Sequence, residues 1–200
     1  MKHLRLLSWS SCLMWMLVLA SCHTSAYEQT VRAELNSGIR YDSLFLGFRF
    51  GETRKTFFDK GWKLNKQGLV MQGPENKNVQ YRISAADSTQ FPIRFLFYPH
   101  FDGNDKIKEM RVAFDYEGWS PWSARFGSDS LLVAVKDTLM NWYGGNPFVL
   151  VEPKNEGDKP LWAKVDGNRR VVIYKKNERV VAGKISDLLH DDILDKNKLK

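Results

Sequence analysis

Residues suited to metal and nucleophile chemistry are scarce in this chain. Its 200 residues include two cysteines and four histidines, and His23, His100 and His190 show no metal-ligand spacing. The sequence also lacks a Gly-x-Ser-x-Gly nucleophile elbow and a glycine-rich phosphate loop. We therefore predict no catalytic residue, no metal and no cofactor, and we expect that the chain is not an enzyme.

Carboxylates that could do acid–base work are scattered along the sequence. The candidates are Asp87, Asp115, Glu117, Asp166 and Asp187. Acid–base catalysis needs such groups within reach of one substrate, and no spacing in the sequence pairs any two of them. A hydrolase with dispersed site residues stays open as the weakest alternative.

The N-terminus lacks acidic residues and a long hydrophobic run. No acid precedes Glu28, and no apolar run reaches the roughly 20 residues that a membrane-spanning helix needs. The chain opens with Lys2 and Arg5 and continues with an apolar run over residues 12–20 that leads into small residues. This layout is typical of a secretory signal. Residues 1–21 are predicted to be a cleaved signal peptide.

Leu19-Ala20-Ser21-Cys22 resembles the bacterial lipobox, in which small residues precede an invariant cysteine. In that family the cysteine thiol receives a diacylglycerol, signal peptidase II cuts before it, and the new amine is usually acylated. The resemblance implies lipidation of Cys22 and a stable anchor, because one acyl chain alone binds a membrane only marginally. No thiol would then remain for a disulfide, a zinc site or a nucleophile, since Cys12 lies in the removed segment. An ordinary cleaved signal with an incidental cysteine is the alternative.

The charge balance is basic but dispersed. Loss of residues 1–21 removes Lys2 and Arg5 and no acid, so the formal net charge falls from +7 to +5. A basic balance can indicate nucleic acid or an anionic surface, and export argues against nucleic acid. Five basic residues in strand-like segments are expected on solvated sheet faces: Arg82, Arg94, Arg111, Lys164 and Lys184.

Composition divides the mature chain into three parts. Residues 22–40, with the lipidated cysteine first, have few large apolar groups and no sustained period, which predicts a flexible tether. Residues 190–200 are rich in charge and predict a frayed helix or a disordered tail. The body between them, residues 41–189, carries the patterns of regular secondary structure.

The body looks like one motif used twice, with half-repeats at about 41–118 and 128–189. In the first half, Thr53 suits a helix start and Gly61 a helix end. In the second half, Ser128, Asp129 or Ser130 could cap a helix that Gly144 stops. Each helix is followed by three segments of period-two alternation, which predict antiparallel meanders at residues 79–83, 93–97, 110–114, 161–165, 169–175 and 179–185. We predict an α+β fold of two helix-plus-three-strand units that share one core.

This unit, with Leu139-Met140-Asn141-Trp142-Tyr143-Gly144-Gly145-Asn146-Pro147 closing a helix, resembles the β-lactamase-inhibitor-protein-like fold. That fold includes the SmpA/BamE outer-membrane lipoproteins and many small Bacteroidetes lipoproteins of unknown role. The resemblance spans most of residues 41–189 and implies binding rather than chemistry. The chain departs from the secreted inhibitor members in lacking their disulfides, and it is much longer than a single BamE-like unit.

The most distinctive local sequence is Tyr116-Glu117-Gly118-Trp119-Ser120-Pro121-Trp122, between the two halves. Aromatic side chains on a loop with glycine and proline can stack on sugars or fill a pocket of a partner. Alternatively, Trp119 and Trp122 fill the seam between two sheets. Trp62, expected at the end of the first helix, allows the same two interpretations. These three tryptophans are the candidate contact residues.

Together these patterns predict a lipid-anchored protein of the bacterial cell envelope, at the outer membrane and facing the periplasm. We expect a non-enzymatic module that binds or scaffolds a protein partner. A glycan-binding surface lipoprotein is the alternative. The predicted partners are the membrane, through lipid on Cys22, and a protein of the envelope, with a glycan as the alternative partner and nucleic acid excluded.

Overall fold

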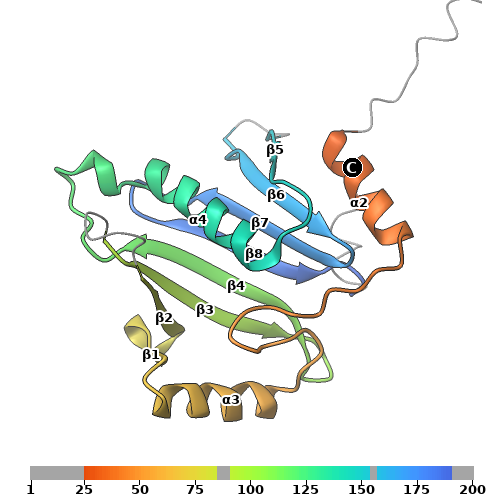
Figure 1. Ribbon diagram of the computed structural model, residues 1–200, viewed down its shortest axis with the longest axis horizontal. Helices are drawn as coiled ribbons and strands as arrows, with labels where there is room; N and C mark the ends of the chain where they lie inside the picture. The colour runs from red at the N-terminus through yellow and green to blue at the C-terminus, as the bar shows by residue number, and fades with distance from the viewer. Residues whose placement is uncertain (1–24, 85–90, 154–156, 191–200) are drawn as a thin grey trace, which may run out of the picture.

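A computed structural model describes residues 25–84, 91–153 and 157–190 (Figure 1). This part of the chain is α+β, with three α-helices and one eight-stranded antiparallel sheet. The helices are α2 (Ala26–Asn36), α3 (Arg54–Lys66) and α4 (Ser128–Tyr143). The strands are β1 (Val70–Gln72), β2 (Val79–Ile83), β3 (Ile93–Phe101), β4 (Ile107–Tyr116), β5 (Val149–Val151), β6 (Leu161–Asp166), β7 (Arg169–Lys175) and β8 (Val181–Asp187).

The sheet is continuous, in the order β1-β2-β3-β4-β8-β7-β6-β5. Antiparallel pairing of β4 with β8 joins its two ends, with Met110 opposite Ile185 and Phe114 opposite Val181. The predicted α+β class with antiparallel strands is confirmed, but there is no seam between two sheets within the described residues. Each predicted run of three strands is also preceded by a fourth strand, β1 or β5. Both have three residues, too few for alternation to be recognised.

The core lies between the sheet and α4. Leu131, Val135 and Leu139 recur every fourth residue along α4 and are fully buried. From the segment before α3, the Phe45 ring lies 4.7 Å from the Phe95 ring of β3 and 6.0 Å from Trp142 of α4. Buried side chains from both ends of the sheet form one cluster. Each such side chain contributes about 1.5–3 kcal/mol by leaving water.

The helix ends match the sequence in part. Thr53 caps α3 as predicted, because its hydroxyl accepts a hydrogen bond of 3.2 Å from the backbone N–H of Thr56. Gly61 does not end this helix. The helix continues to Lys66, and Leu64 packs against the core within the added turn, which offsets the roughly 1 kcal/mol that an internal glycine costs.

The start of α4 also differs from the prediction. Gly127 is its N-cap and supplies no side-chain hydrogen bond, so none of the serine or aspartate candidates caps this helix. The predicted stop at Gly144 is confirmed. Gly144 has φ of +59°, a conformation that glycine adopts without strain.

The predicted flexible tether is wrong for residues 26–36, which form α2. Ser25 caps α2 by accepting a hydrogen bond of 3.2 Å from the N–H of Glu28. Three residues one helical turn apart, Tyr27, Val31 and Leu35, pack against buried Val165 and Leu188. Strand alternation turns Val165 away from α4, so α2 covers the face of β6 that α4 leaves open.

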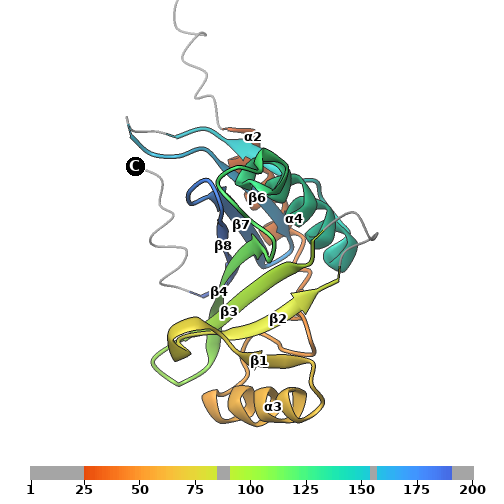
Figure 2. The ribbon, with the colours of Figure 1, turned by 90° about the vertical axis from the view of Figure 1, so that its left-hand side faces the viewer.

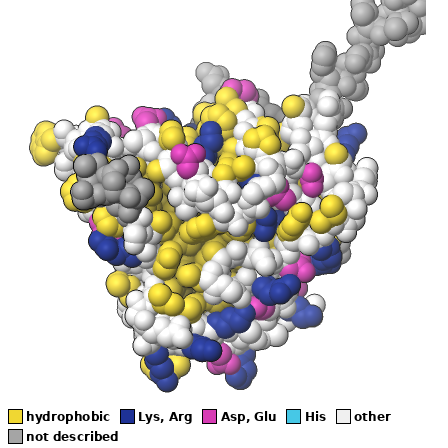
Figure 3. All heavy atoms as spheres, in the orientation of Figure 1, with side chains coloured by type: hydrophobic (Ala, Val, Ile, Leu, Met, Phe, Trp, Pro, Cys, Tyr) yellow, Lys and Arg dark blue, Asp and Glu magenta, His cyan; other side chains and the backbone are white. Residues whose placement is uncertain are grey.

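Several predictions fall outside the described residues: the signal peptide, Cys22, His23, Asp87 and the tail after His190. Within the described ranges, no helix has the length and apolar character needed to cross a membrane. Figure 2 shows α2 near the upper end and α3 at the lower end of the molecule. In the space-filling view of Figure 3, Lys and Arg side chains gather at the lower end, over α3.

Candidate functional site

The segment of residues 119–122 leaves the end of β4 in two successive turns. The N–H of Trp119 donates to the carbonyl of Tyr116 at 3.3 Å, and the N–H of Ser123 donates to the carbonyl of Ser120 at 3.1 Å. A Cβ at Gly118 would lie 2.2 Å from a ring atom of Phe91, so the absence of a side chain here lets the Phe91 ring pack against the bend.

The two tryptophans of this segment lie in different environments. Trp119 is partly buried against the core, with the guanidinium of Arg179 5.4 Å from its ring centre. Trp122 is 93% exposed. The alternative that these tryptophans fill space in the protein interior therefore holds in part for Trp119. It does not hold for Trp122.

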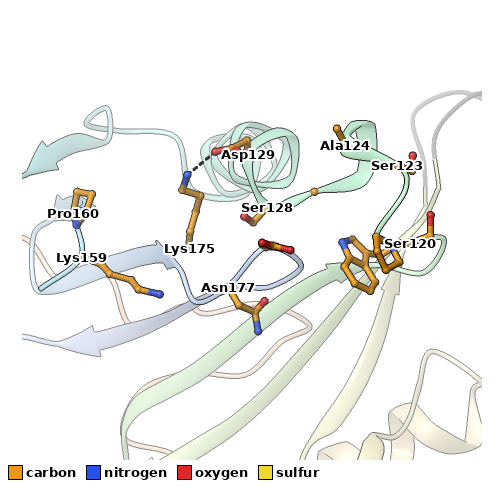
Figure 4. A pocket seen from close by; sticks show the side chains of 13 residues that line it. Ser120, Ser123, Ala124, Ser128, Asp129, Lys159, Pro160, Lys175 and Asn177 are labelled. Atoms are coloured by element: carbon orange, nitrogen blue, oxygen red, sulfur yellow. Dashed lines mark hydrogen bonds and ion pairs between the residues drawn. The ribbon is translucent and has the colours of Figure 1, made fainter. Parts of the chain in front are cut away.

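A groove of about 660 Å³ lies beside this segment (Figure 4). Trp119 and Pro121 line it, together with residues at the start of α4 and in the turn between β7 and β8. Lys175 and Asp129 form an ion pair of 2.6 Å across the groove. Glu178 and Lys159 add one further charge of each sign, so the groove has mixed polarity and no excess charge.

The start of α4 contributes hydrogen-bond donors to the groove. The N–H of Ser128 donates to the carbonyl of Glu178 at 2.7 Å. For the backbone N–H group of Asp129, which lines the groove, no acceptor is present among the described residues. A free donor in the first turn of a helix attracts oxygen atoms of a ligand or of water. This N–H and the Trp119 indole line the same groove, which can therefore bind a polar ligand or the backbone of a partner.

Trp62 does not belong to this groove. It lies on α3, at the lower end of Figure 1, and is 64% exposed. Its exposed neighbours are Phe58 on the same helix and Met71 on β1. Trp119 and Trp122 therefore share one segment but different environments, and Trp62 lies on a separate surface.

The four candidate carboxylates within the described residues, Asp115, Glu117, Asp166 and Asp187, each have a different partner. Asp115 accepts two hydrogen bonds from Arg94, at 2.9 and 2.6 Å, and this carboxylate raises the pKa of Arg94. Glu117 pairs with Arg82 at 3.0 Å. Asp187 accepts a hydrogen bond of 2.9 Å from Asn168, and Asp166 pairs with Lys164. Each carboxylate therefore holds a structural partner. Among the residues that the structure describes, no His, Cys, Asp and Glu cluster could hold a metal ion.

Lys164, predicted on a solvated face, is instead buried. Its ammonium group donates to the carbonyls of Gly144 and Asn146 and to Asp166, the last at 2.8 Å. The side chain points toward the end of α4, where unpaired carbonyls attract a cation. By contrast, the prediction of solvated side chains is correct for Arg111, Lys184 and Arg82, whereas Arg94 is partly buried.

Sequence reasoning missed the network around Lys164. Arg169 donates to the carbonyl of Ser43 at 3.1 Å, contacts Asp166 at 3.4 Å, and lies 4.0 Å from the ring centre of Tyr143. Burial raises the pKa of Tyr143, whose hydroxyl therefore stays neutral. The only sequence signal for this network is the alternation of charged and apolar residues in Lys164-Val165-Asp166. That pattern does not show which backbone carbonyls accept hydrogen bonds from the lysine. The network joins β6 and β7 to the end of α4 and to the segment around Ser43, which gives it a structural role.

Comparison with known proteins gives no relative. No protein-family model, no curated protein and no solved structure matches this chain.

Proposed function

We propose that this chain is a lipoprotein of the bacterial cell envelope that binds a protein partner and catalyses no reaction. Lipid on Cys22 would anchor it at the outer membrane, facing the periplasm. The carrying observation is Trp122, whose indole is 93% exposed at the end of the 119–122 segment; the groove itself is lined by Trp119, Ser120 and Pro121 of that segment. Tryptophan is enriched among the residues that dominate binding energy at protein interfaces, and an indole in solvent buries a large apolar area once a partner covers it.

The proposed architecture is a tandem of two α+β units, as in the β-lactamase-inhibitor-protein-like fold. The element order supports it: α3 precedes β1 to β4, and α4 precedes β5 to β8. The two sets of strands run outward in the same order from the central β4–β8 pair. Four strands in each unit replace the three expected from the sequence. In that fold, binding rather than catalysis is the implied role.

The anchor is tested by mass spectrometry of the native N-terminal peptide. The expected species begins at Cys22 and carries the mass of a diacylglycerol and a further acyl chain. A peptide that begins at Met1, or an unmodified Cys22, would contradict the anchor.

The partner is tested by crosslinking and pull-down from solubilised envelopes, with Trp122→Ala against Val133→Ala. Both substitutions remove an exposed apolar side chain, so neither should unfold the chain. Trp122→Ala is expected to weaken capture of a specific protein by about tenfold or more, and Val133→Ala to leave that capture unchanged. Equal recovery with both variants, or no reproducible partner, would sink the proposal.

A second candidate is glycan binding in the groove beside Trp119. The observation that favours it is the combination of an indole with Asp129, Asn177 and Glu178, because carboxylates and carboxamides bond to sugar hydroxyls while aromatic rings contact the sugar face. Titration with soluble cell-wall glycan fragments, followed by tryptophan fluorescence, tests it. Saturable quenching that Trp119→Phe weakens and Trp122→Ala leaves intact would favour the glycan over the protein partner.

A further inference from the structure

A second groove lies between α3 and β1, far from the 119–122 segment. We name it the α3–β1 groove; it has a volume of about 670 Å³. Its apolar lining comes from Phe57, Phe58, Trp62, Met71, Val79 and Tyr98. Phe58, Trp62 and Met71 are each at least half exposed, whereas Phe57 in the floor is buried. A large apolar side chain inserted here would cover three solvent-exposed apolar groups at once.

Carboxamide side chains surround this apolar lining. Gln72, Asn76 and Asn78 line the groove, and their side-chain amides have no hydrogen-bond partner among the described residues. Asn65 uses its amide to donate to the carbonyl of Val70 at 2.9 Å. A carboxamide offers one acceptor and two donor hydrogens, which match the groups of a peptide backbone. This lining suits an extended peptide better than a hydrocarbon chain.

Helix α3 brings unpaired positive charge to one side of the groove. The helix carries five basic residues, Arg54, Lys55, Lys60, Lys63 and Lys66, and a single acid, Asp59. Three of the five are in ion pairs, Arg54 with Asp105, Lys55 with Asp59 and Lys60 with Glu52, whereas Lys63 and Lys66 have no acidic partner among the described residues. The ammonium group of Lys66 lies 5.2 Å from the ring centre of Trp62, so an unpaired positive charge lies next to the exposed indole. This charge favours an acidic ligand.

We propose that the α3–β1 groove binds an extended acidic peptide segment of another envelope protein. One large apolar side chain of that segment inserts between Phe58, Trp62 and Met71, and its acidic neighbours meet Lys63 and Lys66. The basic aromatic helix would also suit an anionic lipid surface. The peptide is favoured by the hollow shape of the site and its carboxamides.

Orientation favours the peptide as well, in a step that rests on the proposed anchor at Cys22. Figures 1 and 2 place α3 at the end of the molecule opposite the start of α2. Two residues, His23 and Thr24, lie between Cys22 and Ser25, so the two ends are at most about 11 Å apart. The anchored chain therefore turns the α3–β1 groove away from its own bilayer and toward the proteins of the compartment.

The test uses the mature chain with Cys22→Ser, which cannot be acylated, so its outcome does not depend on the anchor. Fluorescence anisotropy is measured with a peptide array in which one central Leu, Phe, Tyr or Met is flanked by glutamates, by lysines or by serines. Acidic peptides are expected to bind more tightly than their lysine counterparts, and added salt should weaken them. Trp62→Ala should weaken this binding by about tenfold, and Val133→Ala, which removes an exposed apolar side chain of α4, should not change it.

Two further measurements locate the ligand and exclude the membrane. The indole N–H resonance of Trp62 should shift on peptide addition while that of Trp122 stays in place. Vesicles of phosphatidylglycerol and phosphatidylcholine form the second arm. Vesicle binding that depends on Trp62 without any peptide binding overturns the proposal. So does the absence of a preference for acidic peptides, or binding that survives both Phe58→Ala and Trp62→Ala.

Discussion

Lys164 shows how one buried charge is stabilised in this fold. Its side chain is fully buried, and its three acceptors are two carbonyls at the end of α4 and the carboxylate of Asp166. Asp166 also accepts from the N–H of Asn146 at 2.8 Å and faces Arg169. One carboxylate thus compensates two buried cations. Because one acid compensates two cations, replacing the acid should lower the stability of the fold by a different amount from replacing one cation.

We expect Asp166→Ala to destabilise the chain more than Lys164→Met. Removing the carboxylate leaves two buried cations uncompensated, at an expected cost of about 3–5 kcal/mol. Removing the lysine leaves Asp166 paired with Arg169 and two carbonyls short of a donor, a loss of about 2 kcal/mol. Urea denaturation gives the free energy of unfolding for both variants. The reverse order would contradict this account of the network.

The residues that sequence predicted correctly are those whose role is local. Thr53 caps its helix and Gly144 stops its helix, and both functions depend on the backbone within a few residues. The burial of Lys164 depends on which face of β6 packs against the end of α4. Its acceptors there, the carbonyls of Gly144 and Asn146, are 20 and 18 residues away in the sequence. Likewise, the difference between Trp119 and Trp122 depends on where the segment leaves β4. The sequence pointed to both tryptophans but did not show that Trp119 is partly buried and Trp122 exposed.

Helix α2 is held on the sheet by a carboxylate as well as by apolar contacts. Glu34 accepts a hydrogen bond of 2.6 Å from the Asn146 side chain and another of 2.7 Å from the N–H of Gly167. These donors belong to the loop after α4 and to the turn between β6 and β7. The single carboxylate therefore links α2 to two other parts of the chain.

We predict that Glu34→Ala loosens α2 while leaving the rest of the sheet intact. Loss of two charge-assisted hydrogen bonds, worth about 1.5 kcal/mol or more, should make local opening of α2 at least roughly tenfold more frequent. Amide hydrogen exchange measures the opening. Arg32→Ala is the matched control, because Arg32 is an exposed residue of the same helix. Equal exchange in both variants would show that the apolar contacts alone hold the helix.

Elements were predictable where their patterns were long enough. Six of the eight strands and the helices α3 and α4 lie where the sequence placed them, because five or more residues of alternation or helical spacing define each. Strands β1 and β5 have three residues each and carry no readable period. Helix α2 was missed because it has no fully buried residue, and its apolar positions are only Tyr27, Val31 and Leu35. The partners of these side chains lie far away in sequence.

The fold as a whole depends on one core, to which both ends of the sheet contribute side chains. Phe45 contacts both Phe95 of β3 and Trp142 of α4, and β4 pairs with β8 along six residue pairs. A single cluster of buried side chains runs through all of these elements. Breaking the chain between the half-repeats would expose this cluster on both sides.

We therefore expect the fragments 41–118 and 128–189 to be unfolded when expressed alone. The intact chain should unfold in one transition, because both halves lose the same core together. Coincident midpoints from far-UV circular dichroism and tryptophan fluorescence are the expected result. A fragment with dispersed NMR resonances, or two separate midpoints for the intact chain, would count against a shared core.

The brevity of β1 and β5 has a consequence for molecules crowded in a plane. Proteins confined to a surface meet their own copies far more often than proteins in free solution do. A sheet whose outermost strands were long would present rows of unsatisfied backbone groups to those copies and invite them to stack without limit. With three residues at each border, this sheet offers only a few such groups. Copies of the chain at high density can therefore remain separate molecules instead of assembling into fibrils through their sheet edges.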